Sequence, residues 1–120
     1  MRGNEEIFIT LMDKNFINHT AIPGSDNGPY GMLNTFKKLI RPAFSDLKVH
    51  IHDQIAEGNK VTTRKTISGI HTGTFMGIAP TGKIINIEII DIVTIVEGKY
   101  LEHWGINTLS QVIAELSKST

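Results

Sequence analysis

Apolar residues in the first third of the chain recur at the spacing of a helix. The segment 4–13 is predicted to form a short amphipathic helix that is capped by Asn4. Its apolar face consists of Ile7, Phe8, Leu11 and Met12. After a loop rich in glycine and proline, a second apolar stripe predicts a helix over about 31–40, which ends before Pro42. That stripe contains Met32, Leu33, Phe36, Leu39 and Ile40.

From Asp46 onwards apolar and polar residues alternate with a period of two, which is typical of β-strands. We predict four antiparallel strands followed by one more helix. The strands run from Asp46 to a turn at 57–59, over 61–70, over 84–96 and over 100–107, and the helix spans 108–117 with Thr108 as its N-cap. This order of elements predicts an α+β fold in which helices pack on one face of a curved antiparallel sheet.

The connection 71–83 between the second and third predicted strands holds three glycines and one proline. These residues suit tight turns. Phe75, Met76 and Ile78 are too apolar for a loop that is fully exposed to water. We expect the connection to fold back over the mouth of the sheet with these side chains packed inward. The alternative is an ordinary long hairpin connection.

The same connection carries a family resemblance. His71-Thr-Gly, Phe75-Met-Gly-Ile and Pro80-Thr-Gly-Lys are similar to the signature of SnoaL-like polyketide cyclases, which belong to the NTF2-like group of cone-shaped α+β folds. Three further segments match in the same order: Asn18-His19 before the loop, 41–58, and 97–104. The resemblance covers roughly residues 3–116 and implies one NTF2-like domain over 1–120, with helices on the concave face of the sheet.

The chain departs from the family pattern at its beginning. NTF2-like folds usually open with a long helix that closes the wide side of the cone, and almost nothing precedes the first matching segment here. We therefore expect the first helix to be shortened or absent. The resemblance then implies a pocket that is open, or covered by a partner subunit.

Composition excludes several classes of partner. The 120 residues suffice for one domain, and twelve basic and twelve acidic residues give a formal net charge of zero. Such a chain has no electrostatic basis for binding nucleic acid or an anionic membrane. There is no cysteine, and no apolar run approaches the roughly 18 residues of a membrane span. The absence of a signal-peptide pattern leads us to expect a soluble, cytoplasmic protein.

Asp91 interrupts an apolar face of the longest predicted strand, where it stands among isoleucines and valines and opposite Asn86 and Glu88. Burial disfavours the charged carboxylate and raises its pKa. Asp91 is therefore a candidate general base near neutral pH, or a protonated hydrogen-bond donor. The alternative is a structural aspartate that is paired with Arg64, Lys65 or Lys99.

Pairing about the turn at 97–98 would bring His103 close to Asp91 on the next strand. A histidine titrates near neutral pH and can give or take a proton. The family resemblance implies an acid/base aspartate on these last two strands, and His103 would stand in its place. The alternative is a core histidine bonded to a backbone carbonyl.

The predicted site thus has Asp91 and His103 as catalytic residues. The substrate-binding residues are predicted to be His19, Phe75, Met76 and Trp104, with Phe75 or Met76 at the mouth of the cavity. His50 and His52 could contribute to a metal site only with a third ligand, and the neighbouring Lys48 favours a solvated surface instead. We expect neither a metal nor another cofactor.

Two functions fit these features. The first is a SnoaL-like polyketide or ester cyclase that performs cofactor-independent acid/base chemistry on a small apolar carbonyl compound, by intramolecular aldol-type ring closure or a related isomerase or lyase reaction. The second is a non-catalytic module of the same fold that binds a small molecule or dimerises. We also expect a homodimer through the outer face of the sheet, because Ile90 and Ile92 lie opposite Asp91.

Overall fold

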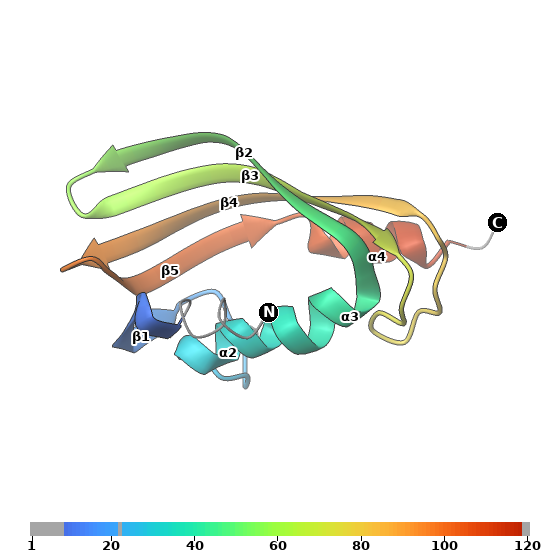
Figure 1. Cartoon of the computed structure of the whole chain (residues 1–120), viewed down its shortest axis with the longest axis horizontal. Coiled ribbons are helices and arrows are strands. Elements are labelled where there is room, and N and C mark those ends of the chain that lie inside the picture. The colour runs from blue at the N-terminus through green and yellow to red at the C-terminus, as the bar shows by residue number, and fades with distance from the viewer. Residues whose placement is uncertain (1–8, 22, 119–120) are drawn as a thin grey trace.

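The computed structural model describes residues 9–21 and 23–118, in which a curved five-stranded sheet bends over a helical segment (Figure 1). The strands are β1 (Met12–Asn18), β2 (Phe44–Glu57), β3 (Lys60–His71), β4 (Ile84–Val96) and β5 (Lys99–Asn107). They lie side by side in the order β1-β5-β4-β3-β2. The predicted α+β class is confirmed. The sheet is mixed rather than wholly antiparallel, because β1 runs parallel to β5.

Strand β1 is the element that the sequence pattern missed. Half of the predicted helix over 4–13 lies outside the described residues. Of the other half, Ile9 and Thr10 are helical, whereas the last two positions, Met12 and Asp13, belong to β1. Met12 and Phe16 are both buried. A separation of four residues places two side chains on one face of a helix and also on one face of a strand, so this spacing fits both structures.

The predicted second helix is present and continues further than expected. It consists of α2 (Pro29–Asn34), a π-helical turn η1 (Thr35–Ile40) and α3 (Arg41–Ala43). Pro42 does not end the helix, because the wider π turn precedes it and Arg41 N–H bonds to the Phe36 carbonyl, five residues back. In a regular α-helix the proline ring would strike the carbonyl four residues earlier.

Helix α4 (Leu109–Leu116) follows β5 and matches the predicted last helix in position. Thr108 is the N-cap residue, as predicted, but its side chain makes no capping hydrogen bond. The Thr108 hydroxyl accepts a hydrogen bond from Glu88 N–H at 2.9 Å, and the Asn107 side chain accepts the one from Leu109 N–H at 2.9 Å. No helix in the described part of the chain is long and apolar enough to cross a membrane.

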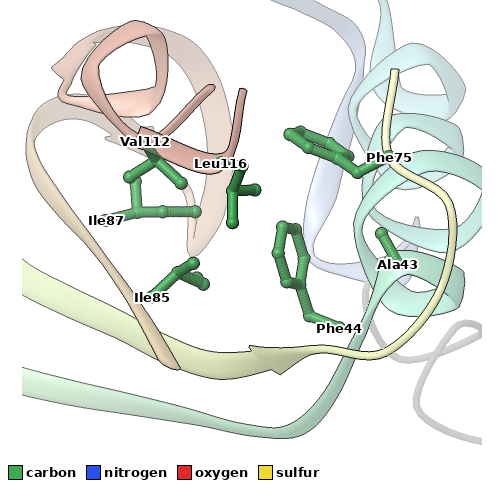
Figure 2. Close-up of a cluster of buried hydrophobic side chains, with 7 residues drawn as sticks. All are labelled: Ala43, Phe44, Phe75, Ile85, Ile87, Val112 and Leu116. Carbon is green, nitrogen blue, oxygen red and sulfur yellow. The ribbon is translucent and has the colours of Figure 1, made fainter. Parts of the chain in front are cut away.

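The hydrophobic core lies at one end of the curved sheet, where α4 and the connection after β3 meet β2 and β4 (Figures 1 and 2). Its buried members are Ala43, Phe44, Phe75, Ile85, Ile87, Val112 and Leu116. The connection 71–83 does fold inward, because Gly73 N–H bonds to the Ala43 carbonyl and Phe75 is fully buried. Met76, by contrast, is 56 % exposed at a positive φ of 49°.

The two neighbours Phe75 and Met76 provide a matched test of this packing. Phe75→Ala should lower the free energy of unfolding by about 3–5 kcal/mol, since it leaves a cavity in the core. Met76→Ala should change it by no more than about 0.5 kcal/mol. Urea denaturation of both variants measures the difference, and equal effects would contradict an inward-packed connection.

Candidate active site

The concave face of the sheet lines a cavity region with two adjacent lobes, of about 540 Å³ and 300 Å³, which share the lining residues Met32, Lys65, Asp91 and His103. The large lobe is mainly apolar, with walls that include Met12, Phe16, Val49, Ile51, Val93 and Ile95. The small lobe lies beside η1 and adds the polar side chains of Asn18, Thr20, Thr35 and Asn107. Both volumes fall in the range of small-molecule sites.

Lys65, Asp91 and His103 line both lobes and therefore mark their junction. They come from the adjacent strands β3, β4 and β5. Asp91 Oδ2 lies 3.1 Å from Lys65 Nζ and 3.5 Å from His103 Nε2, and only 9 % of the Asp91 side chain is exposed. We refer to these three residues as the junction group.

Asn18 fixes the proton on the His103 ring. The Asn18 Oδ1 atom accepts a hydrogen bond from Thr20 N–H at 3.2 Å, which identifies it as the amide oxygen. His103 Nδ1 lies 2.9 Å from the same oxygen and must therefore carry a proton to donate. In neutral His103 the Nε2 atom is then the unprotonated nitrogen. This nitrogen faces Asp91, and becomes its hydrogen-bond donor once it takes up a proton.

Gly105 makes room for this arrangement. It pairs with Asp91 across the β4–β5 ladder. A Cβ atom at position 105 would lie 2.9 Å from His103 Cε1 and 3.5 Å from Asp91 Cβ. A side chain here would therefore displace the His103 ring, so the absence of a side chain at this position is part of the site.

The charge state of Asp91 differs from the prediction. Burial is the largest single influence and acts to raise the pKa of Asp91, but the hydrogen bond that His103 donates when its Nε2 atom is protonated, together with the charge and hydrogen bond of Lys65, outweighs it. The pKa of Asp91 is therefore lowered, and the residue is an ionised carboxylate at neutral pH. The expectation of a raised pKa is wrong because Lys65, one of the alternative partners, is in contact.

Of the six predicted site residues, the structure brings together Asp91 and His103. Trp104 is paired with Ile92 on the convex face, because neighbouring residues in a strand point to opposite faces. His19 stacks on Trp104 with ring centroids 4.6 Å apart and bonds to Glu102. Their predicted place in the cavity is therefore wrong.

The other two predicted substrate-binding residues also lie outside the lining of both lobes. Phe75 belongs to the core, and Met76 is exposed in the connection 71–83. Sequence reasoning did not select Asn18 or Lys65 as site residues. Lys65 alternates with Thr63 and Ile67 on one face of its strand, and that pattern could have pointed to it. No local sequence pattern indicates the contact between Asn18 and His103, because the two residues are 85 positions apart.

Metal ligands do not gather in residues 9–21 and 23–118, which contain no group of three or more suitable side chains. His50 and His52 lie edge to face with ring centroids 4.6 Å apart. His52 Nε2 is hydrogen-bonded to the Thr66 hydroxyl at 2.7 Å. This histidine pair is thus part of a polar network on the convex face.

This protein has an α+β fold, and its curved sheet surrounds an apolar cavity with ionisable side chains at its centre. These features define a class of small cone-shaped domains. Within that class, the family profile of SnoaL-like polyketide cyclases matches residues 1–116, and the chain belongs to this family. The resemblance noted in the sequence is therefore confirmed. Among curated proteins, none matches the chain.

Solved structures of the same fold are numerous. IdmH from Streptomyces antibioticus, a candidate polyketide cyclase, is 26 % identical, with a TM-score of 0.82 over 98 % of this chain and 89 % of that one. A candidate SnoaL-like cyclase from Jannaschia sp. CCS1 is 21 % identical, with a TM-score of 0.81 over 98 % and 81 %. AclR from Streptomyces galilaeus, a candidate hydroxylase, is 24 % identical, with a TM-score of 0.78 over 92 % and 69 %. Because this fold also includes a candidate hydroxylase, the reaction must be argued from the site.

Replacing Asp91 tests the junction group. At pH 7 Asp91→Asn should lower the free energy of unfolding by about 1–3 kcal/mol, because Lys65 and His103 lose their charged partner. A carboxyl group with a lowered pKa stabilises the folded protein above the unfolded pKa and loses that contribution as the pH falls through the folded value. The difference between the two proteins should therefore shrink below about pH 4.

The exposed pair Asp53–Arg64, with atoms 3.0 Å apart and both side chains more than half exposed, supplies the control. Asp53→Asn should change the free energy of unfolding by no more than about 0.5 kcal/mol. Thermal and urea melts at several pH values give the comparison. An unchanged or raised melting temperature for Asp91→Asn at pH 7 would contradict the ionised, paired carboxylate.

Proposed function

We propose that this protein is a cofactor-independent acid/base enzyme that acts on a small apolar carbonyl compound, by intramolecular aldol-type ring closure or a related isomerase or lyase reaction. One observation carries the proposal. His103 Nδ1 lies 2.9 Å from the Asn18 amide oxygen, so in the neutral ring Nε2 is the nitrogen that can accept a proton, and it lies at the junction of a largely apolar cavity. Membership of the SnoaL-like family supports a cyclase-type role.

The geometry favours different roles for the two predicted catalytic residues. His103 Nε2 is the base that removes a proton from the carbon next to a carbonyl group. Asp91 is already ionised and lies 3.5 Å from that nitrogen, so it stabilises the imidazolium that forms. The enolate carbon then attacks a second carbonyl of the same molecule, and His103 returns the proton to the new alkoxide oxygen. The cavity walls contribute by holding the two carbons together.

Hydrogen–deuterium exchange tests the first step without knowledge of the natural substrate. The native protein should accelerate exchange of the protons between the carbonyls of an aryl 1,3-diketone in D₂O, followed by proton NMR. His103→Asn should slow the protein-dependent rate by about 10²–10⁴-fold. His52→Asn, on the convex face, should leave the rate unchanged.

The alternative is a module that binds small molecules without catalysis. This reading predicts that calorimetry detects binding of aryl ketones in the cavity while the exchange rate is the same for native protein and His103→Asn. That result would contradict the proposed enzyme. Binding together with exchange that depends on His103 would instead contradict the binding module.

We further propose that two copies of the chain associate through the convex face of the sheet. An apolar patch crosses β4 and β5 there, formed by Ile90, Ile92, Trp104 and Ile106, and the ladder pairs Ile90 with Ile106 and Ile92 with Trp104. Ile90 is 44 % exposed and Ile106 is 70 % exposed. Contiguous exposed apolar surface of this kind favours an interface, and a twofold axis would bring the patch against itself.

Sedimentation velocity at tens of micromolar should then show a species of twice the 13.3 kDa chain mass. Ile106→Lys should shift the protein to monomers, since it places a charge in the patch. Tyr30→Lys, which alters a 58 % exposed side chain on α2, is the control and should leave the dimer intact. A native protein that sediments only as a monomer would contradict the proposal.

A further inference from the structure

Lys65 is a cationic side chain inside a cavity that is otherwise mainly apolar. Its side chain is 27 % exposed, and its Nζ atom donates to Asp91 Oδ2 at 3.1 Å. An ammonium group has three N–H donors, so contact with one carboxylate oxygen leaves donors for a ligand. Among the described residues that line the two lobes, Lys65 and Asp91 are the ones that carry a fixed charge.

The charges of the junction group change during the proposed reaction. Before proton transfer, Lys65 is positive, Asp91 is negative and His103 is neutral, so the group has no net charge. After His103 takes the substrate proton, the group carries one net positive charge and the substrate has become an anion. The new negative charge resides mainly on the enolate oxygen, which needs a donor or cation beside it in a site that excludes water.

We infer that Lys65 binds the enolate oxygen, and that the substrate is a neutral, enolisable carbonyl compound with an apolar body in the large lobe and a polar, uncharged end in the small lobe. This inference rests on the proposed acid/base function of the same cavity. The position of Lys65 at the junction places its ammonium beside both Asp91 and the space that faces His103.

The residues that line the two lobes support a substrate with an apolar body and an uncharged polar end. The walls of the large lobe match an alkyl or aryl body, because their main members are methionine, phenylalanine, valine and isoleucine. Asn18, Thr20, Thr35 and Asn107 offer the small lobe hydroxyl and amide groups but no charge. Such groups bind a hydroxyl, amide, ester or ketone, and the fixed cation among the described lining residues, Lys65, is already paired with Asp91.

Benzoylacetone provides the probe, because it joins a phenyl ring to an enolisable 1,3-dicarbonyl and its enolate absorbs at a different wavelength from the neutral forms. Titration of the bound probe should show that the native protein lowers the pKa of the diketone by about one to three units, which is at least tenfold more enolate at a given pH. Lys65→Arg should preserve the lowered pKa, and Lys65→Met should abolish it. Lys48→Met, which alters an exposed lysine of β2, should have no effect.

A double variant separates loss of the cation from loss of the fold. Lys65→Met leaves Asp91 without its partner, so Lys65→Met/Asp91→Asn removes both charges together. This variant should bind the neutral ketone 4-phenylbutan-2-one as the native protein does, and should leave the pKa of benzoylacetone unchanged. A lowered pKa in the double variant would overturn the inference, because another group would then stabilise the enolate.

Two further results would overturn the inference: a native protein that binds benzoylacetone with its pKa unchanged, or one that does not bind it at its highest soluble concentration. Failure of the proposed function is a separate outcome, namely deuterium exchange that does not depend on His103. Exchange that depends on His103 without a lowered pKa of the bound probe would reject the role of Lys65 alone. A lowered pKa that depends on Lys65, without such exchange, would reject the catalytic role of His103.

Discussion

The site depends on one constraint, which is that a carboxylate on the apolar concave face of the sheet must be compensated. Asp91 is only 7 % exposed, and an unpaired charge at that depth would be costly. Lys65 on β3 and His103 on β5 contact the Asp91 carboxylate from the two neighbouring strands. The register of three central strands is therefore tied to the site, since a slip of one residue would turn Asp91 to the convex face.

Strand β4 connects this site to the rest of the protein. Its first half supplies Ile85 and Ile87 to the core beneath α4 (Figure 2). Its second half supplies Asp91 and Val93 to the cavity. The core thus anchors one end of the strand that carries the charged group. Side chains supported by a packed strand keep their positions better than side chains on loops, which suits a site that relies on a contact of about 3 Å.

Period-two patterning was sufficient to predict β4, its two faces and the approach of His103 to Asp91. The prediction failed for Met12 and Phe16, because a separation of four residues fits both a helix and a strand. It also failed for His19 and Trp104, which were placed in the cavity on the basis of the family resemblance although strand alternation indicated the other face. His19 and Trp104 directly follow Asn18 and His103, which both belong to the site, so alternation already placed them on the opposite face. The Asn18–His103 contact joins β1 to β5 in parallel, and local periodicity does not indicate which distant strands pair.

The lowered pKa of Asp91 also changes the chemical interpretation of the cavity. An aspartic acid with a raised pKa could have served as base or acid, whereas an ionised aspartate held by Lys65 is a poor base at neutral pH. The function proposed above therefore assigns the role of base to His103. The same ion pair lowers the affinity of Lys65 for a neutral ligand, because Asp91 already satisfies part of its charge. A ligand that becomes an anion during the reaction gains more from the ammonium than the ligand that entered. Such an interaction is stronger in the transition state than in the ground state, and this difference is what accelerates a reaction.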